Sequence, residues 1–239
     1  MDKGNLAIIP ARGGSRRLPG KNIKRLNGIP LIVYTIRAAL KSRNISRVIV
    51  STDDQAIADI ARRHGSEVMI RPAYLCQDNS LTDDAIFYCL NELKTNEGYI
   101  PDKLILLQPT SPFRTFRHID KAFSILKQKR CDAVISVFEP CFHPLKSLIL
   151  TKGGFLEALV SGKYCFSPRQ KLPKAYMPNG AIYLIKTRAF INSGSLLTSK
   201  TSPYIMPVLE SVDIDSKDDF EYASYLISRK KWGNNYARF

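Results

Sequence analysis

The sequence predicts an α/β fold in which a mostly parallel, Rossmann-like sheet is flanked by helices. Along most of the 239 residues, short apolar runs rich in β-branched side chains alternate with amphipathic helical patterns. This alternation is typical of parallel strands joined by crossover helices. The length suits one large domain, and two small domains are the less favoured division. A proline-rich stretch near residues 139–178 breaks the alternation and predicts an arm that extends from the sheet.

The predicted strands are short runs of Val, Ile, Leu and Ala bounded by polar residues, proline or glycine. The first run, at residues 6–9, ends at Pro10 and leads directly into a glycine-rich loop. The later runs lie at residues 48–51, 103–107, 133–137 and 180–185. We expect these five runs to form the core of the sheet.

The predicted helices follow from apolar residues that recur three or four positions apart. Their N-terminal signals are Pro30, Asp53, Thr82, Thr115 and the capping-box pair Ser216 and Asp219. The apolar stripes that follow these signals reach about residues 41, 64, 93, 126 and 227. Each helix therefore has a candidate start and one face for the core.

The stretch that breaks the alternation contains several prolines, two short strand-like pieces and little helical periodicity. Its prolines are Pro140, Pro144, Pro168, Pro173 and Pro178. We interpret the stretch as an excursion from the sheet and not as a second domain. The expected domain therefore covers residues 1–228, including the arm, and residues 229–239 form a basic C-terminal tail.

The charge of the chain points to an anionic partner. Lys and Arg total 36 against 21 Asp and Glu, a net charge of +15. Such a balance favours nucleic acid, a membrane surface, or small phosphorylated or carboxylated substrates. Six cations fall within residues 12–25, a window that contains no acid. The other cations are scattered and no basic face with interleaved aromatic residues is visible, so we expect no nucleic-acid partner.

Other classes of protein are excluded by simple patterns. No apolar run approaches the ~20 residues of a membrane helix, so we expect no membrane association. Pro10 and Arg12 end the first apolar run too early for a signal peptide, and the expected location is the cytoplasm. The five cysteines contain no C-x-x-C pair and the three histidines add no zinc-type cluster, so reduced thiols are expected.

The loop after the first predicted strand has the features of a phosphate cradle. Small residues at Gly13 and Gly14 allow backbone N–H groups to approach anionic oxygens, and Arg12 and Lys21 add charge at either end. The spacing is neither the dinucleotide G-x-G-x-x-G nor a P-loop. A basic surface turn is the alternative. The position directly after a first strand favours a ligand site, because open α/β sheets bind ligands at the carboxyl ends of their strands.

Two carboxylates near the C-terminus have the spacing of a metal site. Asp213 and Asp215 flank Ile214, so in an extended segment both side chains point to the same side. Hard oxygen ligands suit Mg²⁺, which also takes substrate phosphates and waters. A pair of solvated surface carboxylates is the alternative. Asp218 and Asp219 are assigned to the start of the last helix.

Several further motifs follow the first-loop run A-R-G-G-S-x-x-L-P-G-K-N in a fixed order. They are V-S-T-D at 50–53, R-P-A at 71–73 with Asp78, L-L-Q-P-T-S-P-F-R at 106–114, H-P-L-K at 143–146, P-R-Q at 168–170, P-N-G-A-I-Y at 178–183 and V-D-I-D at 212–215. In composition and order this series resembles the CMP-sialic acid synthetases, or acylneuraminate cytidylyltransferases. The resemblance covers roughly residues 5–228, and it implies a nucleotidyltransferase sheet.

The resemblance implies a reaction in which CTP and a nine-carbon sugar acid give a CMP-sugar and pyrophosphate, by in-line attack of the anomeric hydroxyl on the α-phosphate. It implies that CTP is bound by Ala11, Arg12, Gly13, Ser15, Arg16, Lys21, Asn22, Arg71, Thr82 and Gln108. Arg12 and Lys21 would stabilise the charge that develops on the phosphates. Asp213 and Asp215 would be the metal ligands, with Mg²⁺ or Mn²⁺ as the cofactor. These four residues are the expected catalytic set.

The resemblance also implies how the acceptor is held. The sugar-binding residues would be Gln108, Lys146, Arg169, Asn179, Tyr183, Leu196 and Leu197. Arg169 could pair with the sugar carboxylate through two parallel hydrogen bonds. In this family the arm also supplies residues across a dimer interface, so a homodimer is expected.

The chain departs from the family pattern at two places. Arg16 and Arg17 stand where many relatives have Lys-Gly, and Leu196 and Leu197 stand where well-studied sialic acid enzymes carry a Phe-Phe pair. N-acetylneuraminate is the first expected acceptor, and legionaminic and pseudaminic acids remain alternatives. An eight-carbon sugar acid is a further alternative among enzymes, and a basic nucleic-acid-binding protein is the alternative outside them. No side chain is an obvious general base.

Overall fold

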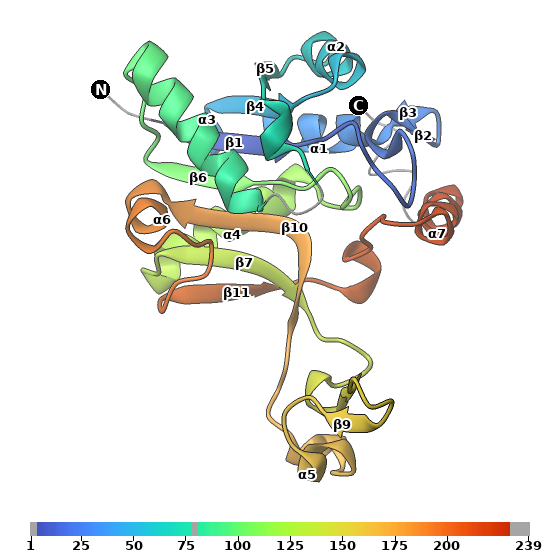
Figure 1. Cartoon of the computed structure of the whole chain (residues 1–239). Coiled ribbons are helices and arrows are strands. Elements are labelled where there is room, and N and C mark those ends of the chain that lie inside the picture. Colours follow the sequence, from blue (N-terminus) through green and yellow to red (C-terminus); the bar gives the residue numbers. More distant parts are fainter. Residues whose placement is uncertain (1–3, 78–80, 230–239) are drawn as a thin grey trace.

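The computed structural model describes residues 4–77 and 81–229, and its core is one seven-stranded sheet (Figure 1). In spatial order the strands are β11 (Thr201–Ile205), β7 (Ala133–Phe138), β10 (Met177–Lys186), β6 (Lys103–Leu106), β1 (Asn5–Pro10), β4 (Arg47–Thr52) and β5 (Glu67–Ile70). Strand β10 is antiparallel to both of its neighbours, and the other neighbouring pairs are parallel. The prediction of a mostly parallel α/β sheet is confirmed.

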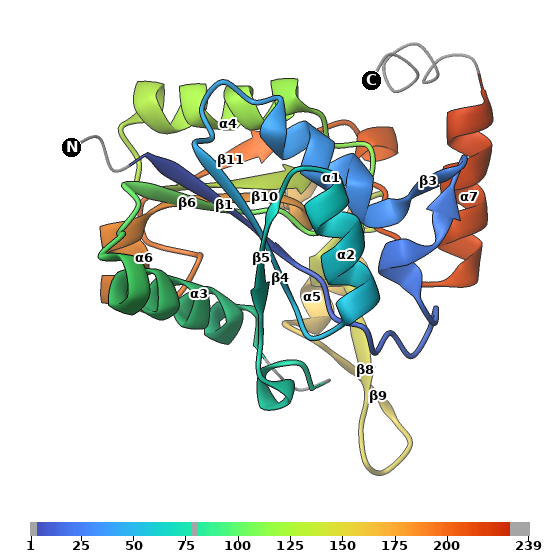
Figure 2. The same ribbon diagram turned by 90° about the horizontal axis from the view of Figure 1, so that it is seen from above.

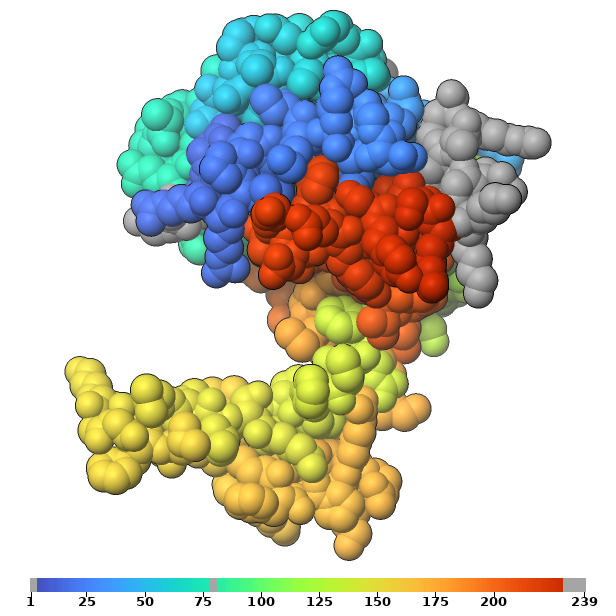
Figure 3. Space-filling model, turned by 90° about the vertical axis from the view of Figure 1, so that its right-hand side faces the viewer, coloured from blue at the N-terminus to red at the C-terminus, as the bar shows by residue number. Residues whose placement is uncertain are grey.

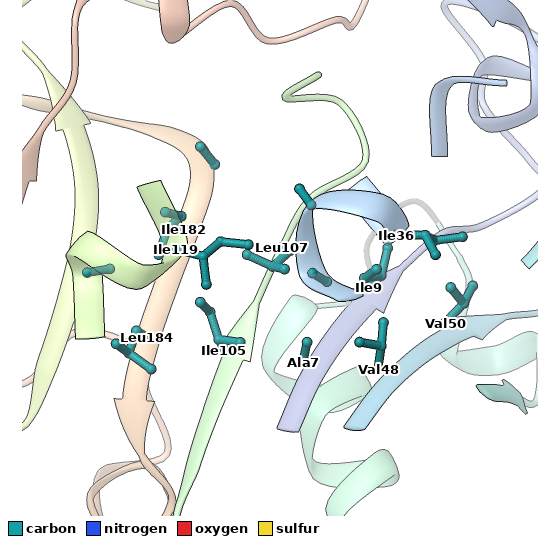
Figure 4. Close-up of a cluster of buried hydrophobic side chains, with 14 of the residues drawn as sticks. Ala7, Ile9, Ile36, Val48, Val50, Ile105, Leu107, Ile119, Ile182 and Leu184 are labelled. Atoms are coloured by element: carbon teal, nitrogen blue, oxygen red, sulfur yellow. The ribbon is translucent and has the colours of Figure 1, made fainter. Parts of the chain in front are cut away.

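Helices cover both faces of the sheet (Figure 2). One face carries α1 (Leu31–Leu40), α2 (Gln55–Arg63) and α4 (Phe116–Lys129), and the other carries α3 (Thr82–Glu97) and α6 (Thr187–Ser193). Successive side chains of a strand point to opposite faces. Accordingly Ala7 and Ile9 of β1 pack in the first cluster, drawn in Figure 4, while Leu6 and Ile8 pack against α3. A third cluster joins α7 (Lys217–Ser228) to the first turns of α1 and to β2 (Arg25–Leu26), which pairs with β3 (Ile29–Pro30).

The two edge strands were not predicted from the sequence. Strand β5 is four residues long and only half buried, so its apolar pattern is weak. Strand β11 contains Pro203, which lowers the strand propensity of the run. Proline fits there because β11 lies at the edge, where one side of the strand needs no ladder hydrogen bonds.

Two predicted helix caps are wrong and two are confirmed. Asp54, and not Asp53, caps α2, because its carboxylate accepts the N–H of Ile57 at 2.9 Å. Thr82 is the first residue of α3 and makes no side-chain cap. The Ser216 box at α7 is present, with Asp219 as its partner. Thr115 caps α4 in a box whose second member is a histidine.

The arm leaves the sheet after β7 and returns through β10. Met177 pairs with Phe138, so the ladder between β7 and β10 continues into the base of the arm. Beyond that base lie β8 (Leu148–Leu150), β9 (Leu156–Ala158) and the short helix α5 (Gly162–Cys165). Figure 3 shows the arm as a lobe that projects away from the body of the molecule.

The division into residues 1–228 and a basic tail stays a prediction, because residues 230–239, like Asp78, lie outside the described residues.

The arm exposes an unusual number of large apolar side chains. They are Phe142, Leu148, Ile149, Leu150, Phe155, Leu156, Leu159, Val160 and Phe166. A patch of this kind on a protein surface marks a site of contact.

None of the helices in the described part of the chain has the length and apolar character needed to cross a membrane.

The capping box of α4 determines which ring nitrogen of His118 carries the proton. Its Nδ1 accepts the backbone N–H of Thr115 at 3.2 Å, so the ring proton is on Nε2, which faces Glu210 Oε2 at 3.5 Å. Burial, and then the nearby charge of Arg114, lower the pKa of His118 to about 4. The imidazole is therefore neutral at pH 7.

We predict that acid destabilises the fold through His118. In the unfolded chain this imidazole has its ordinary pKa near 6.5, whereas the folded chain takes up the proton only near pH 4. The unfolded state therefore binds more protons between these values. The free energy of unfolding should fall as the pH drops from 6.5 to 4, by up to about 1.4 kcal/mol per pH unit. Urea unfolding across this range measures the slope.

His118→Gln is the matched variant, because glutamine is a normal second member of a capping box and does not titrate. Its unfolding free energy should change less over the same pH range. An identical slope in both proteins would assign the effect to other groups.

Candidate functional site

A cleft of about 340 Å³ opens where the parallel strands β1, β4 and β6 end. This is the edge at which open α/β sheets bind ligands. Nine of the predicted site residues line it: Arg12, Ser15, Lys21, Asn22, Arg71, Thr82, Gln108, Asp213 and Asp215. The fold thus brings together residues from the first loop, the start of α3, the end of β6 and the segment before α7.

The first loop is held by contacts to its backbone. The N–H of Gly13 donates to the carboxylate of Asp53 at 3.0 Å, and Asn22 Nδ2 donates to the carbonyl of Arg12 at 3.0 Å. A Cβ on Gly13 would lie 2.6 Å from Asp54 Oδ2, whereas a Cβ on Gly14 would meet no atom within 4 Å. The close approach to the α2 cap therefore requires glycine at position 13 only.

Other residues predicted for this loop lie at its margins. Ala11 is buried, and its N–H donates to Ser51 at 2.9 Å, so only its backbone is near the cleft. Arg16 is exposed and lines an adjoining groove with Arg12, Lys21 and Asp215. The groove extends the cationic wall of the cleft toward solvent.

A cation and two carboxylates face each other across the cleft. Lys21 Nζ donates to Asp215 Oδ1 at 2.8 Å, although the two residues are 194 positions apart in the sequence. Burial, opposed by a hydrogen bond with Thr110 and reinforced by the neighbouring Asp215, raises the pKa of Asp213. Two carboxylates on one wall therefore repel each other and favour a cation between them.

The segment that carries the carboxylates is fixed at both ends. The N–H of Ile214, between them, donates to the carbonyl of Thr110 at 2.9 Å. The N–H of Asp215 donates to Asp219 Oδ2 at 3.0 Å. Because Asp219 also caps α7, the helix start and the carboxylate wall share one anchor.

The loop after β6 is organised by a buried arginine. Arg114 is 1% exposed, and its guanidinium donates to the carbonyls of Gln108 and Ala181 at 3.0 Å each and to the hydroxyl of Thr35. Gln108 then points toward Gly180, where a Cβ would lie 2.3 Å from Oε1. Gly180 also has a φ of +73°, so both conformation and space require glycine there.

Arg71 forms a buried part of the opposite wall. It is 7% exposed, its N–H donates to the carbonyl of Thr52 at 2.7 Å, and its Nε has no hydrogen-bond partner among the described residues. Buried polar atoms are normally paired. The Arg71 guanidinium therefore keeps an unused hydrogen-bond donor beside the cleft, although the Nε atom itself is buried.

The cleft also contains residues that the sequence did not single out. They are Pro10, Leu75, Cys76, Gln77, Leu81, Pro109 and Thr110. Burial raises the pKa of the Cys76 thiol, with Arg71 opposing the shift. Thr110 follows Gln108 by two positions in a motif, and that spacing was the available signal for it.

Most of the predicted sugar-binding residues lie outside the cleft lining. Asn179 is buried, where its Oδ1 accepts from Ser136 Oγ at 2.6 Å and its Nδ2 donates to Ser211 Oγ at 2.9 Å, so it fixes the irregular start of β10. Tyr183 also lies outside the cleft lining, and burial and then the charge of Asp213 raise the pKa of its phenol. Of the predicted acceptor residues, only Gln108 lines the cleft itself.

The remaining acceptor residues are on the arm and beyond α6. Arg169 donates to the carbonyls of Cys141 and Pro140 at 2.7 and 2.8 Å and pairs with Glu139 at 3.0 Å. Lys146 ends a short 3₁₀ turn on the same arm. Leu196 packs against the second core cluster, and Leu197 is 67% exposed. A single chain does not bring these residues to its own cleft.

The chain matches the sequence profile of the cytidylyltransferase family over residues 6–149. It is 34% identical over 217 residues to the N-acylneuraminate cytidylyltransferase of Streptococcus agalactiae serotype V, a match that covers 90% of this chain and 51% of that protein. The chain thus spans about half the length of that relative. It is 33% identical over 229 residues to the CMP-N,N'-diacetyllegionaminic acid synthase of Legionella pneumophila, with 93% and 95% of the two chains covered.

In fold, the chain is similar to a solved CMP:2-keto-3-deoxy-manno-octonic acid synthetase complexed with CTP. The TM-score is 0.68, and the match covers 95% of this chain and 99% of that chain. The sequence identity is 16%, so this likeness concerns the fold alone.

We predict that the two glycines of the first loop differ in their tolerance of substitution. Gly13→Ala forces the Asp54 cap to move, which should cost about 1 kcal/mol and lower the melting temperature by about 2–4 °C, together with affinity for CTP. Gly14→Ala adds the same methyl group in open space and should leave both unchanged. Thermal unfolding and CTP titration of the two variants make the comparison; equal effects would contradict it.

Proposed function

Because the chain belongs to the acylneuraminate cytidylyltransferase family, we propose that it transfers CMP from CTP to a nine-carbon sugar acid of the sialic-acid type and releases pyrophosphate. The observation that carries this proposal is the composition of the cleft. Two cations, Arg12 and Lys21, face two carboxylates, Asp213 and Asp215, at the carboxyl edge of the sheet. Such a site suits a triphosphate whose α-phosphorus is attacked.

The nucleotide is held from two walls. Arg12 and Lys21 contact the phosphates, where a cation stabilises the negative charge that develops as pyrophosphate leaves. Gln108 and Thr82 can both donate and accept hydrogen bonds, as reading a base edge or a ribose requires. Arg71 lines the same space, and its buried guanidinium places a positive charge beside the bound nucleotide.

The residues present fit a divalent metal that is completed by its substrate. Within residues 4–77 and 81–229, no three His, Cys, Asp or Glu side chains are grouped to hold an ion. Asp213 and Asp215 supply two hard oxygen ligands, and Mg²⁺ commonly takes one or two carboxylates with substrate phosphates and waters. Bound Mg²⁺ or Mn²⁺ would neutralise phosphate charge and favour ionisation of the acceptor hydroxyl. Lys21, now paired with Asp215, is then free to turn to the phosphates.

The acceptor approaches from the side of Gln108 and Tyr183. The half-buried phenol of Tyr183, whose pKa is raised by burial and then by Asp213, and the carboxamide of Gln108 after β6 offer hydrogen bonds to sugar hydroxyls. Relatives of similar identity are named for acylneuraminic and for legionaminic substrates. We propose N-acetylneuraminate or a related nonulosonate, with legionaminic and pseudaminic acids as alternatives.

We propose that the arm packs against a second copy of the chain. Its exposed apolar side chains have no partner surface within one chain, and Lys146 and Arg169 lie on the arm, away from the cleft. A homodimer would bury the apolar patch and place arm residues beside the partner's cleft. A cytoplasmic location stays a prediction.

The function is tested by pyrophosphate release with CTP and Mg²⁺. The acceptors are N-acetylneuraminic, legionaminic and pseudaminic acids and one eight-carbon sugar acid. We expect release with a nine-carbon acid and with CTP but not ATP. Folded protein that binds CTP and releases nothing across the panel would overturn the proposed acceptor class.

Two variants test the catalytic residues in the same assay. Lys21→Ala and Asp215→Ala should each lower kcat by about 100-fold or more, because each removes a charge that acts on the phosphates or the metal. Lys24→Ala and Asp218→Ala remove equal charges close by and outside the cleft lining, and should keep nearly full turnover. Normal turnover in Lys21→Ala or Asp215→Ala would remove that residue from the mechanism.

We predict that Phe166→Ser and Phe142→Ser shift the protein toward monomer. The two rings are 91% and 88% exposed in one chain, so the substitutions should not destabilise the monomer fold. Sedimentation velocity measures the state, and Tyr74→Ser, at a 65% exposed ring outside the arm, is the control. A monomeric parent protein would contradict the dimer.

A further inference from the structure

A second pocket lies at the end of the sheet opposite the cleft. Its volume is about 500 Å³, and it is lined by Asn5, Asn44, Lys103, Phe123, Ser124, Leu126, Lys127, Arg130 and Lys186. Asn5 and Lys103 are the first residues of β1 and β6, whereas the cleft lies beyond the last residues of these strands. The ends of β1 are about 17 Å apart, so the two sites are distinct. In Figure 2 this end of the sheet is the one from which the N-terminus leads, away from α7.

The sheet register concentrates positive charge in this pocket. Lys103 pairs with Asn5 on one side and with Lys186 on the other, so the three side chains form one row across β1, β6 and β10. Like charges directly opposite each other on paired strands are destabilising. Lys186 has a carboxylate partner, Asp132, at 2.8 Å. Among the described residues, the Lys103 ammonium donates to the neutral Asn5 Oδ1, at 3.5 Å, and forms no ion pair.

Helix α4 adds two more cations from above the row. Lys127 and Arg130 line the pocket, and neither forms an ion pair in the described part of the chain. Arg130 is the C-cap of α4 with a φ of +49°, a left-handed conformation that glycine normally fills. An arginine there costs about 1 kcal/mol of backbone strain. The chain thus carries a cation at a position where glycine would be less strained.

A purely structural role explains part of this arrangement. Cations at the C-terminal end of a helix interact favourably with its dipole, which accounts for Lys127 and Lys129. It does not account for Lys103 and Lys186, which come from strands, nor for their direct pairing. No acid lines the pocket. Four cations therefore line one cavity, and of these four only Lys186 has an ion-pair partner, Asp132, among the described residues.

We propose that this pocket binds a small phosphorylated organic molecule at a site separate from the cleft. The dianionic phosphate monoester would lie between Lys103, Lys127 and Arg130, where the planar guanidinium matches two phosphate oxygens. The organic body would rest on Phe123 and Leu126, which form the apolar floor. Asn5 and Asn44 add polar groups at the mouth, and the volume suits a small ligand.

The test uses phenyl phosphate, an aromatic phosphate monoester, titrated calorimetrically into the full chain. We expect one binding event that saturating CTP does not displace. Lys103→Gln and Lys127→Gln should each weaken the affinity by about tenfold, the loss of one charge-assisted hydrogen bond. Lys129→Gln, on the same helix and outside the pocket lining, should bind phenyl phosphate as the parent does.

The Arg130→Gly variant distinguishes a role of Arg130 in ligand binding from a role in the stability of the fold. Glycine relieves the left-handed backbone, so the melting temperature should not fall, while affinity for phenyl phosphate drops by about tenfold. Displacement by CTP, or equal affinity in the parent, Lys103→Gln and Arg130→Gly proteins, would overturn the proposal. So would the absence of any binding at millimolar phenyl phosphate.

Discussion

The buried guanidinium of Arg114 joins three elements that must be in place before the cleft can exist. It donates to the carbonyl of Gln108 after β6, to that of Ala181 in β10 and to the hydroxyl of Thr35 in α1. Burying a charge is costly unless its hydrogen bonds are made, so these acceptors and the arginine require one another. Arg114 thereby holds the backbone at Gln108, and its charge adds to burial, the larger cause, in lowering the pKa of His118.

The cleft combines charges from the two ends of the chain. The first loop supplies the cations, and the segment before α7 supplies the carboxylates. Each side is anchored by a helix cap: Asp54 packs against Gly13, and Asp219 holds the N–H of Asp215. Groups held in this way need little rearrangement when charge develops on a substrate, which is the basis of electrostatic catalysis. In the chain without ligands, the Lys21–Asp215 pair holds these two charges beside each other.

The sheet gives the molecule different chemistry at each end. Where the parallel strands end, loops carry charges of both signs around a polar cleft. Where they begin, the register aligns lysines beside the basic end of α4, around an apolar floor. The arm forms a third surface, which is apolar and leaves through the base of β7 and β10. One fold therefore presents a polar cleft, a cationic pocket and an apolar surface at three separate places.

The sequence by itself determined the α/β class, the five main strands, most helices, the Ser216 box and nine residues of the cleft, because periodicity, capping and ordered motifs are local signals. Only the tertiary structure decided that β10 runs antiparallel, that the edge strands β5 and β11 exist, and that Asp54 rather than Asp53 caps α2. It also decided that Asn179 supports β10 and that Arg169 binds carbonyls of its own arm. The pairs Lys21–Asp215 and Lys103–Lys186 join residues that are far apart in the chain. The sequence did not predict these pairs, because burial and strand register arise only when the sheet assembles.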